Sequence, residues 1–243
     1  MKKDTSRKIR TAAFLAVLAA VTTFVSCKKD KDEDKVTFIT PDVPEDVLPT
    51  ASQDSITKYM NIYEGDTPPE LNGQFLSKPH KLIYASYDPE NDSTFFYDRY
   101  VAFVFSSGHG IDFYGKQWDD SLQDAQGNYH AGYYEEHIQN LKITGTGDNF
   151  SCYYITEGYP NGMYAKQSTI FSGEWVKGEG LKDFKVAVIL VETSGNPNLQ
   201  PKGSFRILGD ADRLAEVNNW MGKATEPASH GEGGGDAFFL FRK

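Results

Sequence analysis

Apolar and polar residues alternate with a period of two along much of the chain after residue 70, which is typical of half-buried β-strands. In the segment 184–191 every second residue, beginning with Phe184, is apolar, and the other face changes from Lys185 to apolar residues. The segment 100–105 is apolar on both faces, so we expect a central strand there, covered on both sides. The pattern predicts strands at 74–76, 81–87, 95–105, 111–114, 137–144, 150–156, 168–176, 184–191, 204–208 and 237–241.

Glycine, proline and asparagine separate these strands at short intervals. Turns are predicted at 145–149, 158–162, 177–180 and 194–198. Eight or more strands joined by short turns predict an antiparallel meander that closes into a small β-barrel, with a β-sandwich as the alternative.

Two segments have helical spacing instead. Ile56, Tyr59 and Met60 share one face of a short helix within residues 52–64. Asp210 can cap a second helix over 210–217, so the fold class is mostly β with one short C-terminal helix.

The N-terminus has the pattern of a bacterial lipoprotein signal. A basic stretch precedes the uncharged run 11–25, and Ser26-Cys27 follows at once. The run is of signal-peptide length and short for a membrane span. We therefore predict a signal peptide at 1–26 and acylation of Cys27, including palmitate. An ordinary secretory signal that happens to contain a cysteine is the alternative.

Residues 27–50 are predicted as a charged, proline-containing tether, followed by a single β-rich domain over 51–243. The block 28–35 is entirely Lys, Asp and Glu, which favours a solvated, extended chain. Removing residues 1–26 takes away five basic residues and one acidic residue, which lowers the formal charge from −9 to −13. So acidic a chain is unsuited to binding nucleic acid, and its membrane partner is expected to be reached through the lipid on Cys27.

The block after Cys27 resembles the acidic and basic stretch of Bacteroidetes-type lipoproteins, which implies export to the outer face of the outer membrane. A periplasmic spacer is the alternative. The tract Thr67-Pro68-Pro69-Glu70-Leu71-Asn72-Gly73-Gln74-Phe75, with the tracts 98–103 and 147–150, is similar to the entry of lipocalin-like barrels in uncharacterised lipoproteins of that group. The resemblance implies a lipocalin-like barrel over about residues 60–220 and brings no catalytic motif. Lipocalins have Gly-x-Trp where this chain has Gly73-Gln74-Phe75.

Candidate sites are few. Exposed aromatic residues bind sugars or line pockets, and we select Trp118, Tyr133 and Tyr134 as ligand-binding candidates. Ser55, Ser93 and Ser121 each follow an aspartate, which resembles the O-glycosylation motif of Bacteroides-type secreted proteins. The five histidines have no metal-site spacing, so no metal and no cofactor are predicted. Cys152 is predicted as a buried residue of the strand 150–156.

These features predict a non-catalytic, lipid-anchored binding module for a small molecule, glycan or protein partner at the outer membrane. The alternatives are an anchored hydrolase, for example one acting on glycans, and a purely structural envelope-interaction protein. The sequence shows no nucleophile elbow and no glycine-rich phosphate loop, which argues against enzymatic activity without deciding the question.

Overall fold

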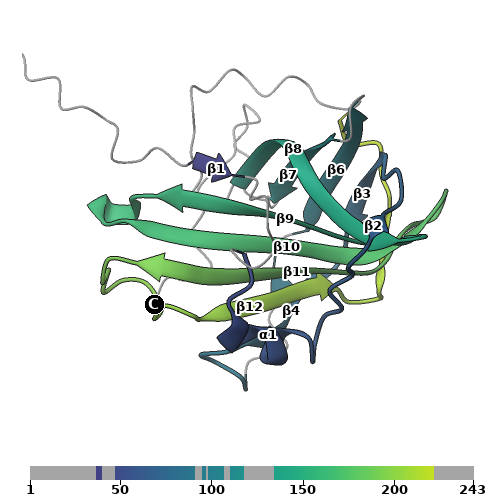
Figure 1. Ribbon diagram of the computed structural model, residues 1–243. Helices are drawn as coiled ribbons and strands as arrows, with labels where there is room; N and C mark the ends of the chain where they lie inside the picture. The colour runs from purple at the N-terminus through teal and green to yellow at the C-terminus, as the bar shows by residue number, and fades with distance from the viewer. Residues whose placement is uncertain are drawn as a thin grey trace, which may run out of the picture. The chain divides into compact units, whose positions relative to one another are not determined.

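The computed structural model describes residues 37–39, 47–90, 95–96, 98–106, 110–117 and 134–221. These residues form one largely antiparallel sheet system with a single α-helix (Figure 1). In chain order the elements are β1 (Thr37–Ile39), α1 (Thr50–Ile56), β2 (Asp66–Thr67), β3 (Gly73–Ser77), β4 (His80–Ala85), β5 (Phe95–Phe96), β6 (Arg99–Ser106), β7 (Gly110–Gln117), β8 (Tyr134–Thr146), β9 (Asn149–Gly158), the 3-10 turn η4 (Pro160–Gly162), β10 (Ala165–Val176), β11 (Gly180–Thr193), β12 (Phe205–Asp210) and β13 (Leu214–Val217).

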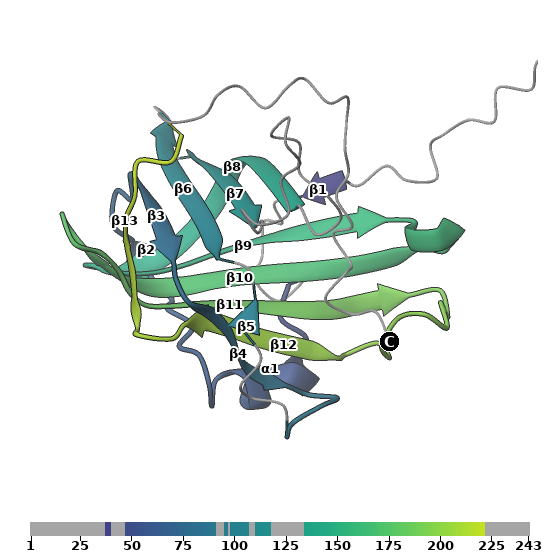
Figure 2. The same cartoon turned by 180° about the vertical axis from the view of Figure 1, so that it is seen from behind.

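Eight strands close into an antiparallel barrel. The ring runs β3–β6–β7–β8–β9–β10–β11–β13, and β13 returns to β3 through the pairing of Glu216 with Leu76 (Figure 2). Because the ring follows chain order, it is the predicted meander barrel, and the sandwich alternative is excluded. The predicted strand at 237–241 lies outside the described residues.

Two segments of the chain leave the ring of barrel strands and pair with each other outside it. β4 and β5 lie between β3 and β6 in the chain, and β12 lies between β11 and β13. β12 pairs with β11 on one side and with β4 on the other, so the barrel wall at β11 continues into an outer sheet. This extension creates the three-strand surface on which the candidate site lies.

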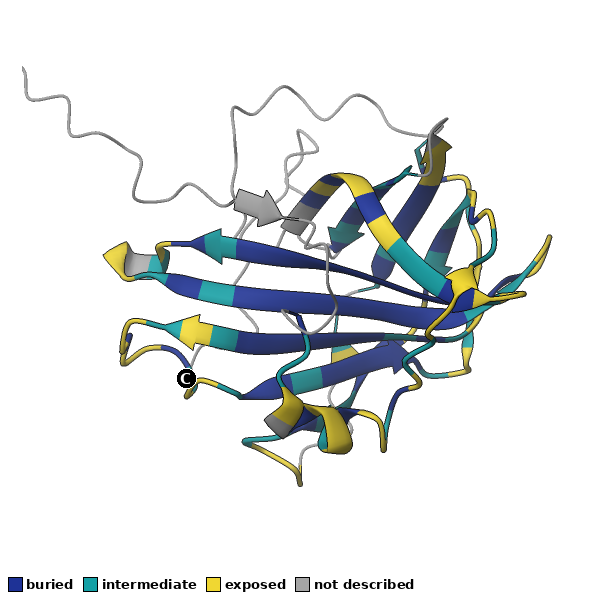
Figure 3. Cartoon of the chain, viewed as in Figure 1, coloured by how far each residue is buried: buried dark blue, intermediate teal, exposed yellow. Residues whose placement is uncertain are grey.

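The long strands bury both faces (Figure 3). Along β11, Val186, Val188 and Leu190 belong to the barrel core, whereas Ala187 and Ile189 face a second core outside the wall. That outer core is covered by the segment 47–62, in which Ile56 and Met60 are buried. The predicted alternation is confirmed. A short helix is present as predicted, but α1 ends at Ile56, so Tyr59 and Met60, expected on its face, follow the helix.

The predicted C-terminal helix is wrong. Residues 214–217 form β13, which pairs with β11 and β3. Two aspartates disfavour the helix locally, because the Asp210 carboxylate accepts the N–H of Asp212 and the Asp212 carboxylate accepts the N–H of Leu214. The backbone of Arg213 is also left-handed, with φ 73°. A strand here closes the barrel, which a helix could not do.

Two further expectations need correction. Part of the predicted tether joins the fold, since β1 pairs with β9 and Val47 is buried. The strand predicted at 95–105 is two strands, and only part of its outer face is covered. Trp220 packs on Tyr100, but Val104 and Phe105 are 38% and 40% exposed.

Candidate functional site

The barrel interior is packed with aromatic rings. Phe103, Phe113 and Phe171 form a chain of contacts, with ring centroids 5.3 Å and 4.6 Å apart, and Phe184 stacks on Phe171. Cys152 is buried in the same core, as predicted, and burial raises the pKa of its thiol well above the ordinary value. The space that holds ligands in a lipocalin-like barrel is therefore filled by side chains here.

One end of this interior carries polar residues. Both carboxylate oxygens of Glu136 accept hydrogen bonds from Arg99 Nη2 at 3.0 Å, and the Arg99 guanidinium lies 5.4 Å from the centroid of the Phe171 ring. Burial, and then the charge of Glu136, raise the pKa of Tyr154 well above its usual value. The Arg99–Glu136 ion pair and the Tyr154 side chain are thus shielded from solvent.

A serine, a histidine and an aspartate also meet where β3, β4 and β12 adjoin. Ser77 Oγ lies 2.9 Å from His80 Nδ1, and Ser77 also hydrogen-bonds the Asp210 carboxyl group. Serine is thus the middle member, whereas a hydrolase triad needs histidine in the middle. Burial and the charge of Arg99 lower the pKa of His80 to about 3, so the ring is neutral at pH 7 and a poor base.

A hollow of about 300 Å³ opens on the outer side of the wall, next to Asp210. Its lining residues come from β4, β11, the end of β12 and the β12–β13 turn. They are Lys81, Ile83, Asp183, Phe184, Lys185, Asp210, Ala211 and Arg213. None of these was a sequence-predicted site residue.

The register of three strands builds the floor of this hollow. Gly209 of β12 pairs with Lys81 of β4 on one side and with Lys185 of β11 on the other. A side chain at Gly209 would meet Ile83 Cδ1 at 2.8 Å and Lys185 Cγ at 3.2 Å. Gly209 therefore lets the Ile83 side chain and the stem of Lys185 pack closely over β12. The two lysines lie on one face of the sheet, about 10 Å apart, which is two strand spacings.

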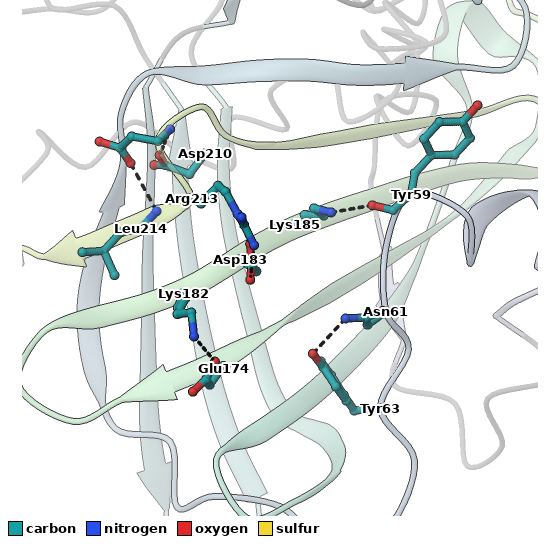
Figure 4. Close-up of polar contacts among 11 residues, drawn as sticks. Tyr59, Asn61, Tyr63, Glu174, Lys182, Asp183, Lys185, Asp210, Arg213 and Leu214 are labelled. Carbon is teal, nitrogen blue, oxygen red and sulfur yellow. Dashed lines mark hydrogen bonds and ion pairs between the residues drawn. The ribbon is translucent and has the colours of Figure 1, made fainter.

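The acids around the hollow already have partners (Figure 4). Asp183 receives two hydrogen bonds from Arg213, at 2.5 Å and 2.9 Å, and this guanidinium lowers the pKa of the carboxyl group. Asp210 accepts the backbone N–H groups of Lys78 and Asp212. Burial, and then the Asp212 side chain, raise the pKa of Asp210 to about 6.

The lysines keep donors available. Lys185 Nζ donates one hydrogen bond to the carbonyl of Tyr59 at 2.6 Å, and an ammonium has three N–H donors (Figure 4). Burial lowers the pKa of Lys185. Within the described residues, Lys81 forms no ion pair. The hollow therefore presents unused cationic donors beside carboxylates that are already occupied.

A second hollow, of about 320 Å³, lies where the chain before β3 crosses the wall. Its walls include Phe105, Ile111 and Ile143, and Asp66 and Glu70 also line it. Its lining contains acidic residues and no cationic residue, so its charge is opposite to that of the first hollow.

The structure places the predicted site residues apart from both hollows or does not describe them. Cys27, Ser93, Ser121, Trp118 and Tyr133 lie outside the described residues. Tyr134 begins β8, where its backbone pairs with Gln117. Ser55 lies in α1. Gly209 lies within β12, where a glycine often marks the close approach of other groups, but the predicted strand ended at 208 and so did not include it.

No protein-family model, curated protein or solved structure matches this chain. Among the described residues, no helix is long and apolar enough to cross a membrane. The same part of the chain contains no group of three or more His, Cys, Asp or Glu side chains suited to a metal ion.

Proposed function

We propose that this protein is a lipid-anchored outer-membrane module that binds an anionic group, on a glycan or a small molecule, in the hollow between Lys81 and Lys185. The observation that carries the proposal is the row Lys81–Gly209–Lys185, because it places two cationic side chains on one face of the sheet, where both line the hollow. A chain with a formal charge of −9 would repel anions unless a local site reversed its field.

The anchor rests on the N-terminal sequence. The basic start, the apolar run and Ser26-Cys27 support acylation of Cys27, and the charged block 28–35 supports exposure on the cell exterior. An anchored module that faces the exterior can bind ligands on its surface directly from the surroundings, so it needs no enclosed cavity to carry them. The filled barrel interior agrees with such a surface-binding role.

The ligand class follows from the donors and the size of the hollow. Ammonium groups form charge-assisted hydrogen bonds to carboxylate, sulfate or phosphate oxygens. A volume of about 300 Å³ is at the small end of ligand pockets and suits one sugar ring or a group of similar size. Ile83 and Phe184 provide apolar contact for the body of such a ring.

The test uses the full-length protein in detergent, with sulfate and glucuronate as probes in calorimetric titrations. Lys81→Gln and Lys185→Gln should each weaken binding about tenfold, because each removes a charge-assisted hydrogen bond. Gly209→Ala should also weaken it, because the added methyl group would collide with Ile83 Cδ1 and Lys185 Cγ and displace both side chains. Lys182→Gln is the matched control, since Lys182 lies on β11, outside the lining, and pairs with Glu174.

Absence of sulfate and glucuronate binding by the native protein would refute the anion site. An equal loss in Lys182→Gln would refute the assignment to this hollow, because it would reflect the general charge of the surface.

A further inference from the structure

Two neighbouring turns form one braced surface at the end of the long strands. The Asn196 side chain donates a hydrogen bond to the carbonyl of Pro160 at 2.8 Å, and the N–H of Ser194 donates to the carbonyl of Tyr164 at 2.9 Å. The β9–β10 and β11–β12 turns therefore hold each other in place. We call residues 158–164 and 194–203 together the turn platform.

The composition of the turn platform differs from that of the rest of the chain. Lys202 is its one charged residue, although 24% of the chain is charged. Tyr159 is 48% exposed and Met163 is 36% exposed, and the Tyr159 and Tyr164 rings pack edge to face at 5.6 Å. A surface with one charged residue and an exposed tyrosine and methionine is suited to an apolar or interfacial partner.

β1 ties the turn platform to the N-terminal segment. It runs antiparallel to β9, with Thr37 opposite Glu157, so its N-terminal end points toward the platform (Figure 1). Cys27 precedes Thr37 by ten residues, which can span at most about 35 Å. An acyl group on Cys27 would therefore bring the membrane within short reach of this end of the strands.

We infer that the turn platform rests on the bilayer interface beside the lipid anchor and orients the barrel on the membrane. This inference rests on the acylation of Cys27 in the proposed function. Tyrosine rings favour the membrane interface because they combine an apolar body with a polar hydroxyl group. Lys202, at the platform's rim, suits lipid phosphate. The contact holds the anion hollow away from the membrane, since Lys185 and Thr193 are eight residues apart on β11, or about 27 Å.

The test uses a fluorescent label on the full-length acylated protein. Met163→Cys provides an exposed thiol, whereas Cys152 is buried and Cys27 is acylated, so an environment-sensitive dye reacts at one site. Lys177→Cys is the matched control, because Lys177 is exposed in the β10–β11 turn at the opposite end of β10. Both proteins are added to vesicles of phosphatidylethanolamine and phosphatidylglycerol, with or without nitroxide-labelled lipid.

The label at 163 should shift to the blue, be quenched by the nitroxide lipid and resist aqueous iodide, whereas the label at 177 should do none of these. Equal iodide quenching at both positions would overturn the inference.

Sedimentation with the vesicles is the separate readout of the anchor. If the protein sediments but the label at 163 is not quenched, the anchor is present and the platform does not contact the bilayer. If the protein stays in solution, both the anchor and the platform contact are ruled out. A blue shift that grows with protein concentration, without nitroxide quenching, would identify a protein partner and also overturn the inference.

Discussion

The barrel interior and the hollow on its outer wall both contain charged side chains, but they use them in opposite ways. Inside, Arg99 and Glu136 are almost fully buried and neutralise each other at 3.0 Å. Outside, Lys81 and Lys185 flank open space, and the nearby carboxylates are bound elsewhere. Charges of the first kind fix the packing of a core, whereas charges of the second kind are available to a ligand. In the proposed function, the binding site therefore lies on the outside of the wall and not in the barrel interior.

Removing one partner of the interior pair should produce the largest effect on stability. Glu136→Gln leaves the Arg99 charge buried without a counter-charge, so we expect the free energy of unfolding to fall by about 3–5 kcal/mol. Urea unfolding measures this loss. Glu174→Gln is the control, because the Lys182–Glu174 pair is exposed and its removal should leave the urea midpoint unchanged. Similar midpoints for both variants would contradict the division between interior and outer charges.

The comparison of the barrel interior with the outer hollow also shows which parts of the structure can be predicted from the sequence. Strand alternation predicts the two faces of β11, since burial on each face follows a local period of two. The turns at 147 and 178 are also local, because glycine with positive φ is required there. Asp210–Val217 was misread as a helix, because the pairing of β13 with β3 joins segments about 140 residues apart, and no local pattern encodes it.

The hollow escaped prediction for the same reason. Lys81 and Lys185 are about one hundred residues apart, and only the registers of β4–β12 and β11–β12 bring them to either side of Gly209. The aromatic residues chosen from the sequence were selected for type alone. In this chain most described aromatic rings fill the core, whereas the available donors belong to lysines that appear ordinary in sequence.

The second effect concerns His80, whose side chain is also buried. Its pKa is 6.5 in an unfolded chain and about 3 in the fold. The unfolded state therefore takes up a proton first as the pH falls, and the folded state loses stability between about pH 6.5 and 3. The expected loss is about 1.4 kcal/mol per pH unit, or about 2 kcal/mol from pH 6.5 to 5.

His80→Gln removes this titration while keeping a polar side chain beside Ser77. The difference in unfolding free energy between native protein and variant, measured in urea at pH 6.5 and 5, should therefore change by the same amount. Asp210 acts in the opposite direction, because its pKa of about 6 exceeds the unfolded 3.8 and protonation favours the fold. It is present in both proteins, so its contribution cancels in the difference. A difference that stays constant with pH would show that His80 is not held neutral by burial.

The smallest effect on stability, and the sharpest test of the outer site, is expected for Asp183→Asn. Asparagine tolerates the positive φ of 51° at this position, and the Asp183–Arg213 pair is largely exposed, so the urea midpoint should scarcely move. Removing the carboxylate frees Arg213 and deletes a like charge beside the ligand. Sulfate should therefore bind about threefold more tightly at low ionic strength. Glu179→Gln, in the exposed β10–β11 turn, removes an equal charge outside the lining and should leave sulfate affinity unchanged. Weaker sulfate binding by Asp183→Asn would instead mean that the Asp183–Arg213 pair must stay intact to shape the hollow.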